Sequence, residues 1–297
     1  MAINVDKKME NKHIKRRSML QDIWHRLLKN RGAILGMIFL ILLIAAAILS
    51  PILFDYNKDI IGQNMKERLL APGAVHWFGT DEYGRDLFAR VIYGARYSLV
   101  IGAGAVLLGL IVGTCLGSIA GFYGGFMDSI IMRGIDVFYS IPNIMTAVVI
   151  VSLLGTSTVN LMIALAFSCS SSFARIVRAS VMTIRDQEYV ESSYAMGLPT
   201  WKIIIKHIIP NCMSPIIVQI TLLIGSTIIS ASSLSFLGIG VPAPAPEWGA
   251  LLSAGRGHIR DASYMCIIPG LAIMFTVLAL NLLGDGLRDA LDPKMKK

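Results

Sequence analysis

Charged residues are scarce in this sequence. They make up 15% of its 297 residues, whereas soluble proteins carry about 25%. Hydrophobic residues account for 55%, and the mean hydropathy is +0.64. The composition therefore argues against an ordinary soluble domain and predicts a protein that lies in lipid.

Residues for disulfide, metal and nucleotide chemistry are also sparse. The four cysteines lie far apart and form no C-x-x-C pair, which argues against a disulfide framework or a metal knuckle. The five histidines are scattered and no H-E-x-x-H motif occurs, so no zinc site is predicted. No Gly-Lys dipeptide occurs, so the pattern that cradles a nucleotide phosphate is missing. We expect no cofactor in the chain itself, and any ATP must be bound by a partner.

Six apolar runs predict an all-α membrane protein with about six transmembrane helices. The first run, residues 33–54, is long enough to cross a hydrocarbon core of about 30 Å. The basic segment before it is much longer than that of a signal peptide, so we interpret the run as a retained anchor. The other runs cover residues 98–121, 137–154, 159–174, 213–237 and 264–283.

The distribution of Lys and Arg predicts the orientation in the membrane. The N-terminal segment, residues 1–32, holds nine basic residues against three acidic ones, which places it in the cytoplasm. Six spans return the tail, residues 291–297, to the same side, and this tail is also basic. The net charge of +8 follows this positive-inside pattern and does not indicate a nucleic-acid-binding face.

The predicted order along the chain follows from these spans. The first span, residues 33–54, leads to an extracytoplasmic loop, residues 55–97, and then to a five-helix core, residues 98–290. Within the core, residues 122–136 and 175–212 face the cytoplasm. Arg133 and Asp136 begin the third span and are placed at the cytoplasmic interface, because a charge at mid-bilayer costs about 2.5–3.5 kcal/mol on insertion scales.

The second span carries a small residue at every fourth position. Gly109, Gly113, Gly117 and Gly121 share one helix face. In lipid such a face lets another helix approach closely, because packing rather than hydrophobicity drives association. The face predicts either ordinary helix packing or a surface that slides during transport.

The polar segment 184–211 predicts two short helices joined by a sharp bend. Asp186 can cap the first helix, Gly197 suits the left-handed residue that ends it, and Pro199 suits the first turn of the second. Pro210 is expected to end the second helix before the fifth span. Taken alone, the segment is equally consistent with a membrane-surface helix hairpin that has no special purpose.

The second of these helices is expected to be amphipathic. An apolar stripe at helical spacing is predicted on one face, while two lysines stay toward water or headgroups. The stripe consists of Trp201, Ile204, Ile205 and Ile208, and the lysines are Lys202 and Lys206.

The segment resembles the cytoplasmic "EAA" loop of ABC importer permeases. That pattern has Glu-Ala-Ala, three residues, Gly, nine residues and Ile-x-Leu-Pro; here Glu191-Ser192-Ser193, Gly197 and His207-Ile208-Ile209-Pro210 match the spacing. The resemblance implies contacts of Glu191 across an ATPase interface and a bend at Gly197 that sets the angle between the helices. The implied coupling residues are Glu188, Glu191, Ser192, Ser193, Ala195, Gly197, Trp201, Lys202, His207 and Pro210.

Two further stretches narrow the resemblance to the dipeptide/oligopeptide/nickel permeases, in the subunit usually given second of the pair. One contains Gly79-Thr80-Asp81 and Gly84-Arg85-Asp86 and continues to Arg96; the other runs from Ser235 to Gly240 and on to Pro246-Glu247-Trp248-Gly249. The first stretch is equally consistent with a solvated, turn-rich loop. The proline-rich loop 238–248 is expected to be stiff, either as a docking surface for a binding protein or simply as a rigid loop.

The resemblance covers residues 24–293 and implies the function. It implies a permease subunit of an ATP-driven importer in the inner cell membrane, with a second permease, two ATPases that bind ATP and magnesium, and an extracytoplasmic solute-binding protein. Peptide is the implied substrate, and nickel is the alternative. A self-sufficient channel or secondary transporter and a membrane-embedded enzyme are the rival classes, although few charges lie inside the spans and no pair of reactive side chains is evident.

Overall fold

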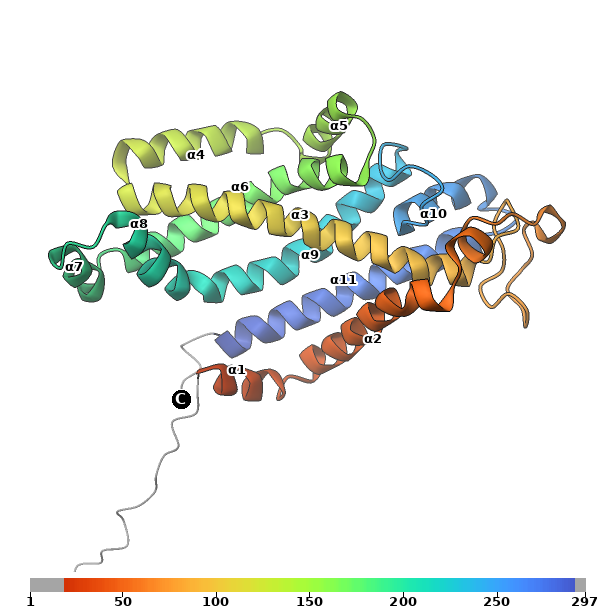
Figure 1. The fold of residues 1–297 in the computed structure, drawn as a ribbon, viewed down its shortest axis with the longest axis horizontal. Helices are drawn as coiled ribbons and strands as arrows, with labels where there is room; N and C mark the ends of the chain where they lie inside the picture. The colour runs from red at the N-terminus through yellow and green to blue at the C-terminus, as the bar shows by residue number, and fades with distance from the viewer. Residues whose placement is uncertain (1–18, 292–297) are drawn as a thin grey trace, which may run out of the picture.

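The computed structural model describes residues 19–291 as an elongated bundle of helices (Figure 1). The predicted cytoplasmic segment 1–32 and tail 291–297 lie partly outside the described residues. The longer helices are α1 (Met19–Leu27), α2 (Arg31–Leu53), α3 (Leu87–Tyr123), α4 (Gly125–Tyr139), α5 (Asn143–Leu154), α6 (Thr158–Ile184), α7 (Glu188–Ala195), α9 (Met213–Phe236), α10 (Trp248–Gly255) and α11 (Tyr264–Leu291). The short helical segments are Tyr56–Ile60, Met65–Glu67, α8 (Thr200–Ile203), Ile204–Ile208, Ile209–Cys212 and Arg256–His258.

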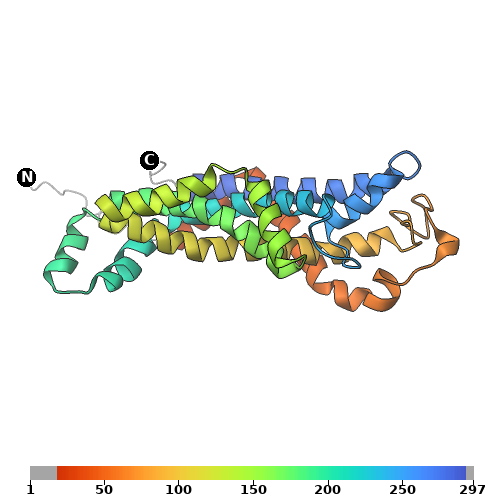
Figure 2. The same cartoon turned by 90° about the horizontal axis from the view of Figure 1, so that it is seen from above.

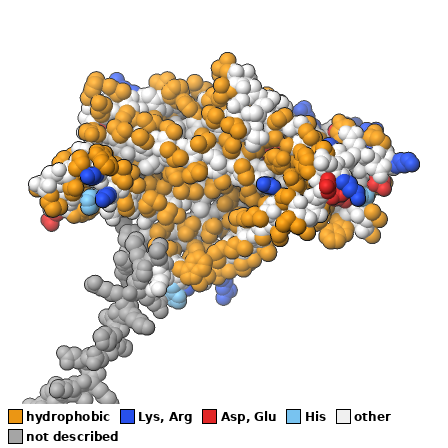
Figure 3. Space-filling view, viewed as in Figure 1, with side chains coloured by type: hydrophobic (Ala, Val, Ile, Leu, Met, Phe, Trp, Pro, Cys, Tyr) orange, Lys and Arg blue, Asp and Glu red, His pale blue; other side chains and the backbone are white. Residues whose placement is uncertain are grey.

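The predicted polytopic helical fold is confirmed. Among the described residues, five helices are long and apolar enough to cross a membrane, and the bent pair α4–α5 makes six if it is counted as one span. On the face shown in Figure 3, hydrophobic side chains cover most of the middle of the molecule and charged side chains gather toward its two ends. One end carries α7, the predicted cytoplasmic side, and the other carries the loops around α10.

The third predicted span is not a single helix. Within the run 137–154, α4 ends at Tyr139 and α5 begins at Asn143, and the two helices are bent by 87°. Pro142 explains the break, because proline has no backbone N–H and disfavours helical geometry at the residue before it. As a result α4 lies along α3 and α6, whereas α5 turns across the bundle (Figure 1).

The predicted position of Arg133 and Asp136 at the cytoplasmic interface stays a prediction, and both residues lie well inside α4. Since α4 begins at Gly125, they lie eight and eleven residues into the helix, which puts Asp136 roughly 16 Å from its start. The helix α6 extends beyond the predicted fourth span to Ile184, so that Arg175 lies inside α6 and donates a 2.8 Å hydrogen bond to Asp136.

The glycines of the second span bring α3 into backbone contact with α6. A Cβ atom on Gly109 would lie 2.5 Å from the Cβ of Cys169, and one on Gly117 would lie 2.5 Å from the carbonyl oxygen of Ala174. Gly113 and Gly121 are equally crowded, by Phe173 at 2.6 Å and Arg178 at 2.8 Å respectively. We call this contact the glycine seam.

We expect Gly113→Ala to lower the thermal unfolding temperature of the purified protein. The new methyl group must push α6 away, and such overpacking costs about 1–3 kcal/mol. Gly134→Ala in α4 is the matched control, because no atom lies within 4 Å of the Cβ it would add. The two variants should therefore differ by several degrees in a melting assay, and equal melting temperatures would contradict the role of the seam.

Candidate functional site: the cytoplasmic helix pair

The helix α7 begins directly after Gln187, whose side chain makes no capping hydrogen bond. The prediction that Asp186 caps this helix is therefore wrong; its carboxylate instead lies 3.3 Å from Arg185 Nε. Two hydroxyls inside the helix bond back to its own carbonyls: Ser192 to Glu188 at 2.8 Å and Ser193 to Tyr189 at 2.7 Å. Both serines thus satisfy their hydrogen bonds locally and leave the helix intact.

The bend after α7 lies at Gly197, as the sequence predicts. Its φ of +75° is in the left-handed region, and its N–H donates to Tyr194 O at 2.9 Å while Leu198 N–H donates to Ser193 O at 3.2 Å. These two bonds close the end of the helix in the Schellman manner. No atom lies within 4 Å of a Cβ at this position, so glycine is needed here for its backbone conformation and not for space.

The second helix does not end at Pro210. The segment α8, which follows Pro199, continues through a wide π turn at Ile204–Ile208 and a tight 3-10 turn at Ile209–Cys212 into α9. The expectation that Pro210 ends the helix failed because a π turn shifts the hydrogen-bond register of the backbone. After such a shift, a helix can include a proline, which has no N–H to donate.

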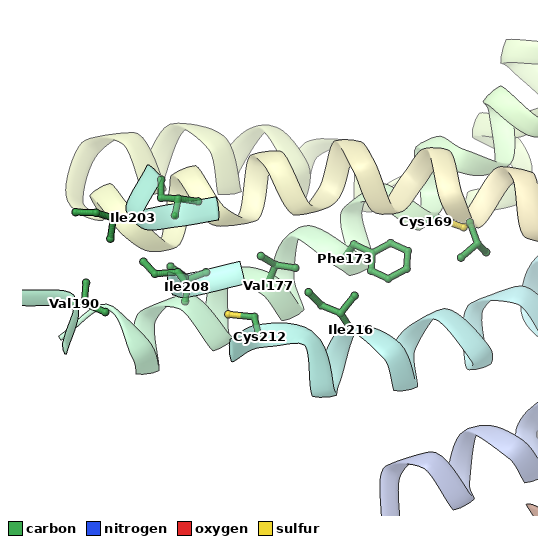
Figure 4. Packing of buried hydrophobic residues seen from close by; sticks show 11 residues of the cluster. Cys169, Phe173, Val177, Val190, Ile203, Ile208, Cys212 and Ile216 are labelled. Carbon is green, nitrogen blue, oxygen red and sulfur yellow. The ribbon is translucent and has the colours of Figure 1, made fainter. Parts of the chain in front are cut away.

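The helix pair, which consists of α7 and of the second helix from α8 to Cys212, is anchored by buried aliphatic residues. Val190 on α7 is 1% exposed, and Ile203 and Ile208 of the second helix are fully buried. They belong to one cluster with Val181 and Cys212 (Figure 4). At about 1.5–3 kcal/mol for each fully buried aliphatic side chain, this cluster fixes the pair to the ends of α6 and α9.

The predicted apolar stripe is only partly correct. Ile204 and Ile208 are buried, but Trp201 is 60% exposed and Ile205 is 56% exposed. The π turn adds a residue between Ile203 and Ile208, so the side chains no longer follow the regular helical period. Trp201 and Ile205 instead line an apolar hollow of about 490 Å³ against α3.

The outward surface of the pair is formed mainly by α7. Its Tyr194 ring stacks on Phe122 at the end of α3, with ring centroids 6.0 Å apart. Partial burial, with a smaller effect of Cys212, raises the pKa of Tyr189. Of the predicted coupling residues, Ser193 is buried, Lys202 and His207 are half-buried, and Glu188, Glu191, Ser192, Ala195, Gly197, Trp201 and Pro210 are exposed.

Two anchoring residues were not singled out from the sequence. Arg185, at the end of α6, donates from Nη1 to Gly121 O at 3.0 Å and so joins α6 to the end of α3. Tyr194 makes the ring contact with Phe122. The only signal for them was that both flank the predicted helix of the loop, since neither belongs to a motif with a known spacing.

The opposite end of the molecule holds a buried ionic cluster. Asp81 is 2% exposed; its carboxylate accepts from Arg85 Nε at 2.7 Å, from the Arg85 and Tyr83 backbone N–H groups, and from Arg90 Nη1. Arg85 and Arg90 are 8% and 4% exposed. The alternative of a solvated loop is therefore wrong for the centre of this segment.

The remaining signature residues hold the same loop in shape. Thr80 is fully buried and its hydroxyl accepts from Leu70 N–H at 2.8 Å, and Asp86 caps α3 by accepting from Ala89 N–H at 2.8 Å. Gly79 and Gly84 have φ values of +77° and +72°. The six residues thus form a compact structural unit at the start of α3.

The Pro246–Gly249 stretch ties α10 to α3 nearby. Glu247 is fully buried and accepts from Ser98 Oγ at 3.2 Å and from the N–H groups of Gly249 and Ala250 at 2.9 Å each. Trp248 is also fully buried and donates from Nε1 to Val91 O at 2.9 Å. Within the proline-rich loop, Gly238, Pro242, Ala243 and Pro244 are exposed.

The helical bundle with its projecting helix pair is the fold of a polytopic membrane protein, and its sequence places it among the subunits of transport systems. The chain belongs to the family of binding-protein-dependent transport system inner membrane components, whose model matches residues 113–297. The N-terminal transmembrane domain of oligopeptide transport permease C matches residues 18–72. The family resemblance predicted from the sequence is confirmed, and the protein resides in the cell membrane.

Relatives of known name match almost the whole chain. The dipeptide transport system permease protein DppC of Alkalihalophilus pseudofirmus is 45% identical over 93% of this chain and 90% of its own. The glutathione transport system permease protein GsiD of Pectobacterium atrosepticum is 42% identical over 94% and 93%. DppC of Bacillus subtilis is 40% identical over 100% and 93%. A MetNI methionine ABC transporter chain has the same fold, with a TM-score of 0.56, 17% identity, and coverage of 68% of this chain and 96% of that chain.

We expect Asp81→Asn to destabilise the protein strongly. The change leaves the charges of Arg85 and Arg90 buried without a counter-ion, which costs about 3–5 kcal/mol. The unfolding temperature should fall by an amount on the order of 10 °C. Asp261→Asn, an exposed position on the same side, is the control and should melt like the native protein. A similar melting temperature for both variants would show that the ionic cluster does not stabilise the fold.

Proposed function

We propose that the chain is the permease subunit of an ATP-driven importer for dipeptides or oligopeptides. It would form the translocation path with a second, homologous permease, receive substrate from an extracytoplasmic binding protein, and be driven by two ATPases that carry ATP and magnesium. The observation that carries the proposal is the helix pair at the cytoplasmic end, which projects sideways from the bundle (Figure 2) and leaves the face of α7 exposed.

The geometry of the pair suits a coupling element. Glu188, Glu191 and Ser192 present acceptors and a hydroxyl to the outside, and Met196 adds a side chain that is 73% exposed. The inner face is fixed by Val190 and by the ring contact of Tyr194. A partner that binds the outer face therefore moves α6 and α9 with it, and does not merely deform a loop.

ATP binding would act by shifting a conformational equilibrium. If closure of the ATPase dimer favours the outward-open over the inward-open state, a change from about 1:99 to 99:1 requires roughly 5.5 kcal/mol of differential binding. The permease itself carries out no hydrolysis in this scheme. Its role is to convert movement of α7 into movement of the membrane helices.

Peptide is the substrate that the relatives favour. Two of the relatives described above are named for dipeptides and one for glutathione, itself a short peptide. The test is to purify the chain from membranes with its partners and to identify, by mass spectrometry, the ligand carried by the cognate binding protein. A second permease, ATPases and a peptide are expected. Transport by the chain alone, or a nickel complex as the only ligand, would overturn the corresponding part of the proposal.

Gly197→Asp should insert normally but uncouple ATP hydrolysis from uptake. The left-handed backbone at this position is strained for a residue with a side chain, so the angle between α7 and α8 should change. Gly257→Asp is the matched control, because it also adds a carboxylate in open space but has no left-handed φ and lies at the opposite end of the molecule.

Uptake and ATP hydrolysis should be measured together in vesicles that contain the assembled transporter. We expect uptake by Gly197→Asp to fall at least roughly tenfold, equivalent to about 1.4 kcal/mol, while hydrolysis continues. Normal uptake by this variant, with membrane levels equal to the control, would refute the assignment of the loop.

A further inference from the structure

Polar side chains gather on one face of the bundle near the middle of α6 and α9. Ser168 and Ser172 of α6 and Ser226 and Ser230 of α9 line a cavity of about 110 Å³, which Asn143 closes at the start of α5. Ser226 is exposed and the other three serines are half-buried. We call this surface the serine face.

The serine face lies near the middle of α6, which is a candidate membrane span. The 27 residues of α6 span roughly 40 Å, and Ser168 and Ser172 lie within about 5 Å of the midpoint of the helix. A hydrocarbon core of about 30 Å therefore surrounds both serines if α6 crosses the bilayer.

An exposed ion pair continues the same face. Arg175 is three residues after Ser172 and so lies on the same side of α6. Its Nη2 donates to Asp136 Oδ1 at 2.8 Å, and its guanidinium lies 4.3 Å from the ring centroid of Tyr139. The Asp136 side chain is nevertheless 60% exposed and that of Arg175 is 40% exposed. Within residues 19–291, Arg175 Nε is buried and has no hydrogen-bond partner, so the exposed part of the guanidinium is its remaining surface.

Lipid is an unsuitable neighbour for such a surface. Charged side chains inside membranes face a water-filled cavity or the interior of an assembly, because hydrocarbon cannot solvate them. The outer surface of α2 shows the contrast: Leu35, Leu42 and Ile48 are each about two-thirds exposed, at 66%, 64% and 68%, and are purely apolar. The serine face and its ion pair are therefore turned toward water or protein in the assembled transporter.

The exposure of the Asp136–Arg175 pair differs from that of a purely structural contact between α4 and α6. A second pair, Asp128 with Arg178, joins the same two helices nearer the cytoplasm, and its side chains are only 16% and 31% exposed. That pair is placed as a structural contact should be. The Asp136–Arg175 pair leaves both charges accessible from the serine face.

We propose that the serine face lines the translocation path and contacts the peptide in transit. This inference rests on the proposed function. The hydroxyls of Ser226 and Ser230 donate to carbonyls of α9 at 3.1 and 3.0 Å, and their oxygens can still accept from peptide N–H groups. Such contacts to the peptide backbone do not select its side chains. A free peptide also carries one ammonium and one carboxylate, and the face offers Asp136 and Arg175 as their counter-charges. The contacts are few and mostly neutral, which suits a site that must release its ligand.

Thiol accessibility tests whether the face meets water. Ser172→Cys and Ser226→Cys exchange one atom and should preserve the fold, and Leu42→Cys at the middle of α2 is the control on an apolar surface. The assembled transporter in membrane vesicles is treated from both sides with a charged, membrane-impermeant thiosulfonate, with the native chain as the baseline. Because the thiolate is the reactive form and needs water to ionise, we expect roughly tenfold or faster modification at the two serine positions.

Protection by substrate tests whether the face meets peptide. Adding the peptide-loaded binding protein with ATP should slow modification of both cysteines relative to empty binding protein. Reaction no faster than at Leu42→Cys would overturn the proposal, because lipid or the second permease then covers the face. Modification that peptide does not slow would overturn the peptide contact. Copurification of the ATPases is scored on the same samples, so a failure of the proposed function itself is recognised separately.

The ion pair is tested by two matched substitutions. Asp136→Asn should lower peptide uptake roughly tenfold, equivalent to about 1.4 kcal/mol, with an unchanged yield of the assembled transporter. Asp128→Asn should instead lower the yield or the unfolding temperature, because it breaks a structural contact. Native-like uptake by Asp136→Asn, or a loss of uptake that only follows a loss of assembled transporter, would remove Asp136 from the proposed path.

Discussion

The glycine seam between α3 and α6 is the contact on which the other features depend. At Gly109 and Gly117 the two helices approach so closely that no Cβ fits between them, and in lipid such close packing is a main source of helix association. The seam fixes the side of α6 that carries Cys169 and Ala174. The remaining sides of α6 are free to carry the ion pairs to α4 and the serines of the cavity.

The cytoplasmic helix pair and the serine face are joined by the same two helices. The pair connects the end of α6 to the start of α9, and these helices supply Ser168, Ser172, Ser226 and Ser230. Arg185 ties the end of α6 to the end of α3 through Gly121, where the seam ends. A displacement of α7 is therefore carried along packed helices to the cavity, without the need for a separate signalling element.

The sequence predicted those features that depend on local chemistry. The apolar runs showed the spans, and the left-handed bend at Gly197 followed from the preference of helix ends for glycine. The break between α4 and α5 follows from Pro142, but the 87° angle between the two helices could not be inferred from the sequence. The burial of Asp81 could not be inferred from the sequence. With Arg85 and Arg90 it forms a charged segment, and such a segment is typical of an exposed loop when its internal ion pairs are not known. The contact between Asp136 and Arg175 could not be inferred from the sequence either, because the two residues lie 39 positions apart.

The two connections of the helix pair differ in stiffness. On the α6 side the helix is regular to Ile184 and is held by Arg185, so it should act as a rigid lever. On the α9 side the chain passes through a π turn and a 3-10 turn around Pro210, where fewer regular backbone hydrogen bonds hold the helix. Segments of this kind concentrate bending in membrane helices. Movement of α7 should therefore shift α6 as a body and bend α9 near Pro210, which changes the distance between the two serine pairs and so the width of the cavity they line.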